Sequence, residues 1–377
     1  MGPPRLSASN QLREIPMAQH PSARPRLAPW AIAFALLFGA VLAPGTALAK
    51  DKFRVAWSIY AGWMPWDYAA ESGIVKKWAD KYGIAIEVVQ INDYVESINQ
   101  YAAGGFDGCV MTNMDALTIP AAGGLDSTAL IVGDFSNGND AVILKGKSAL
   151  KDIKGQQVNL VELSVSHYLL ARGLGTVGLS EKDIKVVNTS DADMVAAFGA
   201  GGVTAVVTWN PLVSEILAMP GTHKVFDSSQ IPGEIIDLMV VNTATLKENP
   251  ALGKALVGAW FETMAIMSKD DAAGKAARTA MGKASGTDLA GYDAQLATTR
   301  MFYKAADAVA FATSPALPET MKHVAQFSFD HGLLGEGAAD AGVVGIAFPD
   351  AKVQGNPANV KLRFDAEYMR MAADGKL

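Results

Sequence analysis

The sequence predicts an α/β fold of two lobes, joined by two crossings of the chain and completed by a helical wrap at the C-terminus. Short apolar segments of strand type alternate with helical patterns from residue 52 to 242, which is typical of α/β architecture with parallel sheets. The pattern changes at 137–139, Asn-Gly-Asn, so the segments form two groups. A chain of this length is also at the size where one core divides into two.

The first 49 residues have the pattern of a cleavable signal peptide. Arg24 and Arg26 precede an apolar run over 30–42, and 47–49 (Ala-Leu-Ala) have the small-x-small pattern of a cleavage site. Spanning a membrane takes roughly 20 apolar residues, so this run is too short. A start at Met17 would give a leader of ordinary length. The interpretation implies export.

The charge balance excludes some partners. The chain has 32 Lys and Arg and 38 Asp and Glu; residues 1–49 hold four Arg and one Glu, which leaves 28 basic and 37 acidic residues and a net charge near −9. Nucleic acid and anionic membranes need a basic surface, so neither is expected as a partner. The single cysteine, Cys109, lies in an apolar strand and is expected to be a buried hydrophobe.

The first group of elements alternates strands with helices. We expect strands at 52–58, 85–90 and 108–111 and from 130, and helices at 65–82, 94–103 and 114–122. Pro65 suits a first helical turn, and glycine pairs end the last two helices.

The second group begins after residue 137. We expect strands at 140–144, 157–161, 185–188 and 205–208 and helices at 165–177 and 192–200, followed by a long strand at 235–242 that returns the chain to the first unit. The remainder from Pro250 is Ala-rich and mostly helical. Lobe one is therefore 50–137 plus 241–377, and lobe two is 138–240. Such folds bind ligands in the crevice beyond the carboxyl ends of the strands.

Four stretches carry a resemblance to a known family. They are WSIYAGWMPWDYAAESGIVKKW, YAAGGFDGCVMTNMDALTIPAAGG, LKDIKGQQVNLVELSVSHYLLARGLGTVGLSEKDIKVVN and MVAAFGAGGVTAVVTWNPL. Together they resemble periplasmic substrate-binding proteins of ABC transporters, in the nitrate/sulfonate/taurine branch, which have the two-lobe type II fold. TNMDALTIPA and VELSVSH are most similar to proteins found beside urea carboxylase and provisionally assigned to urea, or guanidine, transport.

The resemblance implies a function as well as a fold. It implies a monomeric periplasmic protein, not an enzyme and without cofactor or metal, that delivers a small molecule to the permease of an ABC importer in the inner membrane. Guanidine or urea is the expected ligand, and taurine, another alkanesulfonate or nitrate is the alternative. Enzymes of thiamine-precursor or menaquinone synthesis have a similar fold, but they act in the cytoplasm, and the leader argues against them.

Aromatic side chains are the first candidates for the ligand site. Trp63 follows the first strand in a glycine-containing turn, where it could form a flat wall for a planar or cationic ligand. By the resemblance, Trp209 faces the site from lobe two, with Asn210 beside it. A core position is the alternative for both tryptophans, because Trp is also common in cores.

Polar loops supply the other candidates. Asn113 and Asp115 follow the third strand, where capping a helix is the alternative role. Glu162 precedes a helix start, with Ser164 as the expected cap and Ser166 turned towards the cleft. A carboxylate there would repel an anion and suit the N–H groups of guanidinium or urea; favouring the helix dipole is the alternative.

Other residues in these segments are expected to be structural. Asp140, Glu234 and Asp237 lie near the crossings, where they could add charge to the site; as loop acids they are interpreted as hinge-surface residues. His167 is interpreted as a structural histidine, because the five histidines show no close pairing along the chain. No metal set is therefore expected.

Overall fold

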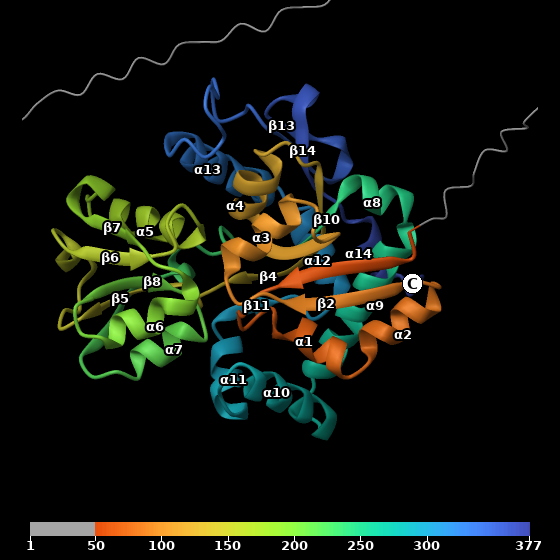
Figure 1. The fold of residues 1–377 in the computed structure, drawn as a ribbon, viewed down its shortest axis with the longest axis horizontal. Coiled ribbons are helices and arrows are strands. Elements are labelled where there is room, and N and C mark those ends of the chain that lie inside the picture. Colours follow the sequence, from red (N-terminus) through yellow and green to blue (C-terminus); the bar gives the residue numbers. More distant parts are fainter. Residues whose placement is uncertain (1–49) are drawn as a thin grey trace, which may run out of the picture. The chain divides into compact units, whose positions relative to one another are not determined.

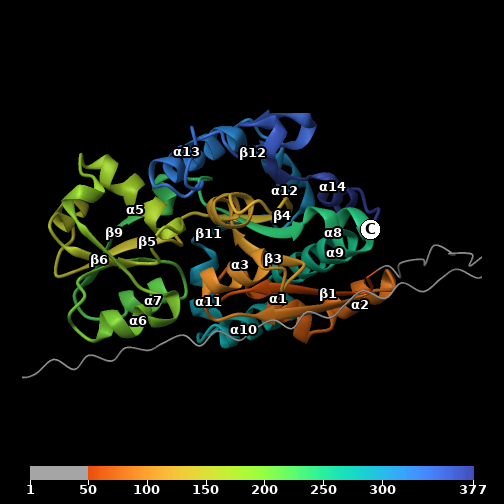
Figure 2. The ribbon, with the colours of Figure 1, turned by 45° about the horizontal axis from the view of Figure 1, so that its top comes forward.

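The computed structural model describes residues 50–377, which belong to one compact unit. The leader predicted for residues 1–49, with its cleavage site and a start at Met17, lies outside the described residues. In the described part of the chain, no helix is long and apolar enough to cross a membrane. Two sheets with their helices make up this unit (Figures 1 and 2).

The larger sheet has nine strands in the order β13-β12-β14-β4-β10-β3-β1-β2, and β11 also pairs with β4. The strands are β1 (Lys52–Trp57), β2 (Ala85–Gln90), β3 (Gly108–Thr112), β4 (Ser127–Ser136), β10 (Ile236–Asn242), β11 (Thr299–Met301), β12 (Gly345–Ala347), β13 (Val353–Gln354) and β14 (Val360–Phe364). The parallel pairing predicted for the first strands holds for β1, β2 and β3. However, β10 runs antiparallel to both β3 and β4, so the sheet is mixed.

The register of β10 brings two acids together. Asp237 lies opposite Thr112 of β3 on one side and opposite Asp134 of β4 on the other. Like charges directly opposite each other destabilise a sheet. This pairing at the end of β3 is therefore a position to examine for function.

The helices that accompany the large sheet come from both ends of the described chain. They are α1 (Met64–Glu71), α2 (Ile74–Lys81), α3 (Tyr94–Ala102), α4 (Asn113–Ala116), α8 (Thr243–Glu248), α9 (Pro250–Met267), α10 (Ala272–Ala284), α11 (Leu289–Leu296), α12 (Ala305–Ala312), α13 (Ala316–Asp330) and α14 (Glu367–Ala373). The single helix predicted at 65–82 is wrong. Gly73 between α1 and α2 has a φ of 78°, a left-handed conformation that ends the first helix.

The smaller sheet has five strands in the order β7-β6-β8-β5-β9. Its elements are β5 (Ala141–Lys145), β6 (Gln157–Leu160), α5 (Val165–Thr176), β7 (Lys185–Asn188), α6 (Asp191–Gly199), β8 (Ala205–Thr208), α7 (Leu212–Leu217) and β9 (Thr222–Asp227). Of these, α7 and β9 had no counterpart in the sequence prediction. The whole sheet falls inside the range predicted for lobe two, and it forms the yellow and green part of Figure 1.

The two crossings between the sheets are hydrogen-bonded to each other. Ser228 bonds through its hydroxyl to Ser136 Oγ at 2.6 Å and accepts from the Gly138 N–H at 2.7 Å. Its own N–H donates to the Asp140 carbonyl at 3.0 Å. The returning strand β10 starts at Ile236, earlier than the predicted lobe boundary at 240, and lies in the large sheet.

The C-terminal part is more than a helical wrap. The helices α9 to α14 agree with the prediction, but β11 to β14 add four strands to the large sheet. The longest, β14, pairs in parallel with β4. These strands have two to five residues each, too few for a periodic pattern to stand out among helical segments.

Candidate ligand-binding site

A narrow cavity lies where the ends of the large-sheet strands meet the small-sheet unit. In this arrangement it has a volume of about 10 Å³, about enough for one water molecule. The residues that line it are Tyr60, Trp63, Tyr94, Thr112, Asp140, Val165, Trp209, Ile235 and Asp237. Both sheets and both crossings contribute, and the position is the crevice expected for this architecture.

Aromatic rings form one wall of the cavity. Trp63 and Trp209 both line it, on opposite sides of Tyr94. The Tyr94 ring centroid lies 5.5 Å from that of Trp63 and 5.5 Å from that of Trp209, the second contact being edge-on. Tyr60 packs on Trp63 at 5.0 Å. The sequence identified the two tryptophans but missed both tyrosines.

Three buried acids form the opposite, charged side, and the sequence did not assign them to the site. Asp140 and Asp237 line the cavity and are each 3% exposed. Asp134, behind Asp237, is fully buried and accepts a hydrogen bond from the Tyr60 hydroxyl at 3.2 Å. The interpretation of Asp140 and Asp237 as hinge-surface acids is therefore wrong.

Burial sets the protonation of these acids. It raises the pKa of Asp134 to about 7 and that of Asp140 to about 7. It also raises the pKa of Asp237 well above its usual value, and the charge of Asp134 adds to the effect. Asp134 and Asp140 therefore exchange protons near neutral pH, where an exposed aspartate is ionised.

Several buried polar atoms around the cavity have no hydrogen-bond partner. They include Asp134 Oδ2, Asp237 Oδ2, Asp115 Oδ1, Trp63 Nε1 and Ser166 Oγ. Buried polar groups in folded proteins are nearly always paired. Most of these unpaired atoms are acceptors, so a molecule rich in N–H groups could donate the hydrogen bonds that they lack.

Asp115 lies one layer behind the cavity. Its Oδ2 accepts hydrogen bonds from the Tyr94 hydroxyl at 2.6 Å and from Thr112 Oγ1 at 2.7 Å. Burial raises its pKa to about 6. Asp115 thus orients two residues that line the cavity instead of lining it.

Asn113 and Asn210 connect segments of the chain. Asn113 donates to the Glu234 carbonyl at 3.1 Å and accepts from the Ile236 N–H at 3.0 Å. Asn210 accepts from the N–H of Ser214 at 3.1 Å, and its carbonyl accepts from the Ala61 N–H at 3.2 Å. Neither amide is part of the cavity lining.

The loop before α5 differs most from its expected role. Glu162 is exposed and does not line the cavity. Ser164 is the N-cap of α5, as predicted, and accepts from the Ser166 N–H at 3.2 Å. Val165, between the two serines, reaches the lining. Leu163 has a φ of 63°, a left-handed conformation that no sequence periodicity indicates.

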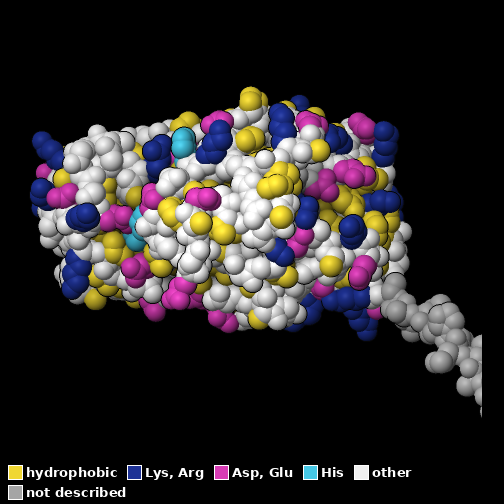
Figure 3. All heavy atoms as spheres, turned by 90° about the horizontal axis from the view of Figure 1, so that it is seen from above, with side chains coloured by type: hydrophobic (Ala, Val, Ile, Leu, Met, Phe, Trp, Pro, Cys, Tyr) yellow, Lys and Arg dark blue, Asp and Glu magenta, His cyan; other side chains and the backbone are white. Residues whose placement is uncertain are grey.

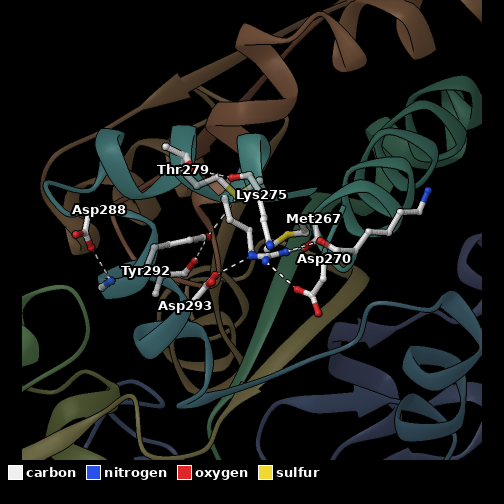
Figure 4. A network of polar contacts seen from close by, with 12 residues as sticks. Met267, Asp270, Lys275, Thr279, Asp288, Tyr292 and Asp293 are labelled. Carbon is white, nitrogen blue, oxygen red and sulfur yellow. Dashed lines mark hydrogen bonds and ion pairs between the residues drawn. The ribbon is translucent and has the colours of Figure 1, made fainter. Parts of the chain in front are cut away.

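The turn after β1 is supported from behind by α10 and α11. Tyr292 of α11 donates its hydroxyl to the Ala61 carbonyl at 2.9 Å. The buried Arg278 of α10 donates to Asp293 Oδ1 at 2.7 Å and to Asp270 Oδ1 at 3.1 Å (Figure 4). This network fixes the helices that hold the Trp63 turn in place.

A second polar cluster lies outside the cavity. His167, Glu181 and His331 bring their side-chain donor atoms within 4.8 Å of one another. The expectation that the histidines have no close pairing is wrong in space, because the His167 and His331 ring centroids are 5.4 Å apart. Their positions 167 and 331 are too distant along the chain for spacing to reveal the contact.

The cavity can accept a cation or a strong N–H donor. Its nine lining residues include no Lys, Arg or His. Carboxylates pair bidentately with planar N–H donors, and aromatic faces attract cations. An anion would meet two acids and ring faces, and among the described lining residues the Trp63 indole N–H is the one donor without a partner.

Solved structures show the class of fold. The alkanesulfonate-binding protein of Xanthomonas axonopodis pv. citri, bound to MOPS, matches with a TM-score of 0.63 at 17% identity, over 77% of this chain and 96% of that one. The periplasmic aliphatic sulphonate binding protein of Escherichia coli matches with a TM-score of 0.61 at 18% identity, over 76% and 94%. The fold is that of the two-lobe periplasmic binding proteins.

The family follows from the sequence comparison. The model of the NMT1-like family matches residues 57–281, and the chain belongs to that family. A provisionally named binding protein of Brucella abortus is 26% identical over 220 residues, which cover 57% of this chain and 66% of that protein, slightly less than two thirds of its length. The taurine-binding periplasmic protein of E. coli is 25% identical over 130 residues, 33% of this chain and 40% of that one.

Proposed function

We propose that this protein is the periplasmic solute-binding component of an ABC importer and that it captures a small nitrogen compound, guanidinium in the first place, in the cavity between its sheets. The binding-protein names of its relatives and its two-lobe fold support the transport role. The protein acts as a monomer that closes around its ligand and then docks on a membrane permease. Its task is capture, not catalysis.

The observation that carries the choice of ligand is the charge of the cavity. Asp140 and Asp237 line it, Asp134 stands behind them, and no basic side chain is among the lining residues. In a desolvated site, a sulfonate or nitrate would be repelled by whichever of these acids is ionised. The relatives named for sulfonates or taurine therefore do not set the ligand of this chain.

Guanidinium fits the remaining features. It is planar, so Trp63 or Trp209 can cover its face, and its N–H groups can donate to the carboxylates of Asp140 and Asp237, which line the cavity. The cavity is narrow, so its occupant must be a small molecule of a few heavy atoms. Urea is the second candidate, because a carboxyl with a pKa near 7, such as Asp140, can donate a proton to the urea carbonyl.

Surface charge gives no support to a macromolecular ligand. On the face shown in Figure 3, acidic and basic side chains alternate without an extended basic area. Nucleic-acid binding requires such an area. A small molecule remains the class of ligand that the geometry favours.

A thermal-shift panel tests the proposal. The purified chain from residue 50 is heated with millimolar guanidinium, urea, taurine or nitrate. A ligand at 100 times its Kd adds about 2.7 kcal/mol to the stability of the folded state and raises Tm. We expect a rise with guanidinium, smaller or none with urea, and none with the anions. A rise with taurine or nitrate alone would overturn the proposed ligand.

A further inference from the structure

Three side chains from three separate segments meet outside the cavity. His167 lies in the first turn of α5, Glu181 opens a 3₁₀ turn (Glu181–Asp183), and His331 directly follows α13. Glu181 Oε2 is 2.7 Å from His331 Nε2, and Glu181 Oε1 contacts His167 Nε2. Phe327 of α13 supports the cluster by stacking on the His331 ring at 4.0 Å.

The cluster joins the two sheet units. The helix α5 packs on β5 and β8 of the small sheet, whereas α13 packs on α4 and α12 beside the large sheet. Figures 1 and 2 both show α13 next to α5. His167 is also only two residues from Val165, which lines the cavity. The contact of Glu181 with His331 therefore holds the cavity wall of one unit against the other.

Hydrogen positions distinguish a proton-bonded cluster from a metal site. His331 Nδ1 faces the Phe327 carbonyl at 2.8 Å, and its Nε2 faces the Glu181 carboxylate. Because the Glu181 carboxylate is an acceptor, Nε2 of His331 carries a hydrogen and donates it to Glu181. These contacts form a charge-assisted pair with Glu181.

His167 supplies the complementary hydrogen. Its Nδ1 accepts from the Leu163 N–H at 3.1 Å, so in the neutral ring the hydrogen is on Nε2, the nitrogen that contacts Glu181 Oε1. A metal ion on Nε2 would move that hydrogen to Nδ1, where it would face another N–H. The two histidines lower the pKa of Glu181 to about 2, with His167 the larger contributor, so the carboxylate is ionised.

We propose that Glu181, held between His167 and His331, is a positioning residue that latches the small-sheet unit against α13 and so slows release of the ligand. The closed arrangement, in which the small-sheet unit is held against α13, can be tested without any ligand. Only the effect on release rests on the proposed function. The two parts can therefore fail separately.

The proton arrangement is tested by NMR of the full chain with ¹⁵N-labelled histidine. We expect His331 and His167 each to carry a hydrogen on Nε2, the nitrogen that is in contact with Glu181. Adding one equivalent of Zn²⁺ should leave both spin systems unchanged. A shift of both Nε2 resonances at stoichiometric Zn²⁺ would identify a metal site and overturn the latch.

The closed arrangement is tested by the distance between two spin labels, placed at Lys185→Cys in the small-sheet unit and Lys269→Cys after α9. Both positions are exposed, and the native Cys109 is fully buried and therefore protected from the label. In the ligand-free protein, Glu181→Gln should add a population with a longer distance. Glu181→Asp should restore part of the short one.

Two further variants control the measurement. Glu215→Gln, an exposed residue of α7 in the same unit, should leave the distribution as in the unsubstituted chain. His331→Phe keeps the stacking on Phe327 and should reproduce Glu181→Gln if that variant folds poorly. An unchanged distribution in both Glu181→Gln and His331→Phe would refute the latch.

The effect on release uses guanidinium as the probe in stopped-flow dissociation. Removing one charge-assisted pair that holds the closed state should raise the dissociation rate about tenfold. The association rate should stay nearly constant. If guanidinium does not bind the unsubstituted chain, the ligand assignment fails while the spin-label result still decides the latch. Tight binding with an unchanged dissociation rate in Glu181→Gln would refute the role in release.

Discussion

At the scale of single residues, the site concentrates groups that weaken the fold. Asp134 and Asp237 lie opposite each other on neighbouring strands, and each has a buried oxygen without a partner. A hydrophobic pair of similar size would stabilise the sheet more. Groups that weaken the fold in this way are expected where a protein must bind a ligand. A bound cation would be attracted by the same two carboxyl groups that repel each other.

Asp140→Asn should weaken guanidinium binding by at least about tenfold, because removing one partner of a buried charge pair costs about 2–5 kcal/mol. Glu162→Gln makes the same chemical change at an exposed residue outside the lining. It should change the affinity less than about twofold, within the range of ordinary surface substitutions. Calorimetric titration of both variants checks this. Equal losses in the two would return Glu162 to the site.

Guanidinium affinity should rise from pH 5 to pH 8. Burial holds the pKa of Asp134 and Asp140 at about 7, so below that pH protons occupy the carboxylates and compete with the cation. The slope can reach about tenfold per pH unit for each proton displaced. Titration calorimetry across this range measures it. Affinity independent of pH would contradict the role of these acids.

The same raised pKa values act on stability in the opposite direction. Without ligand, the folded chain binds these protons more tightly than the unfolded chain, so this contribution is greatest at low pH. It is lost as pH rises from about 4, the usual pKa of an aspartate, to about 7. Ligand-free Tm should reflect this loss.

At the scale of elements, one turn controls how close the aromatic and acidic sides can come. A Cβ on Gly62 would lie 2.5 Å from a ring carbon of Tyr60 and 2.8 Å from Asp134 Oδ2. Only glycine permits this approach. Tyr292 fixes the same turn from the other side through the Ala61 carbonyl.

Gly62→Ala should therefore lower stability by about 1–3 kcal/mol, the usual cost of overpacking, and weaken ligand binding. Gly175→Ala is the matched control, since nothing lies within 4 Å of its added Cβ and the residue is helical. It should be neutral or stabilising by up to about 1 kcal/mol. Thermal unfolding is the measurement, because urea and guanidinium are candidate ligands. A Tm for Gly62→Ala that matches the control would show that the turn can relax.

The elements also show what local sequence can reveal. The strands β1, β2, β3, β6, β7 and β8 were predicted within a residue or two, because apolar runs bounded by glycines are local signals. Trp63 and Trp209 were found because aromatic residues at strand ends stand out. The break at Gly73 and the short strands β11 to β14 were missed, since each depends on tertiary packing.

The acids of the site were missed for a similar reason. Asp134 and Asp237 sit inside apolar strands, and only the pairing of β4 with β10 reveals that they are neighbours. An acid within an otherwise apolar strand was the available signal. Glu162 was favoured as a ligand residue because it precedes a helix, but in the structure its side chain is exposed. The next residue, Leu163, has a left-handed backbone conformation, which the sequence does not reveal.

At the scale of the described molecule, two hydrogen bonds beside the cavity join the large-sheet unit to the small-sheet unit. The Trp209 indole donates to the Ile59 carbonyl at 3.2 Å, and the Ala61 N–H donates to the Asn210 carbonyl at 3.2 Å. Both bonds join a residue that follows β1 in the large-sheet unit to a residue that follows β8 in the small-sheet unit. A ligand that favours this arrangement shifts the population towards it.

Guanidinium should therefore reduce the radius of gyration of the Glu181→Gln chain, in which the latch no longer holds the two units together, while taurine should leave it unchanged. Small-angle X-ray scattering with and without each compound measures this. Asp140→Asn supplies the control, since it weakens binding without touching either hydrogen bond. A radius that guanidinium leaves unchanged at saturation would show that the two units do not move on binding.

The tryptophans at the cavity have a practical consequence. Of the seven in the chain, Trp63 and Trp209 line the binding space, so their emission will respond to an occupant that is itself colourless. Guanidinium and urea absorb little near-ultraviolet light and are hard to detect directly. The protein thus carries its own optical reporter, and changing either indole to phenylalanine would identify which ring the solute touches.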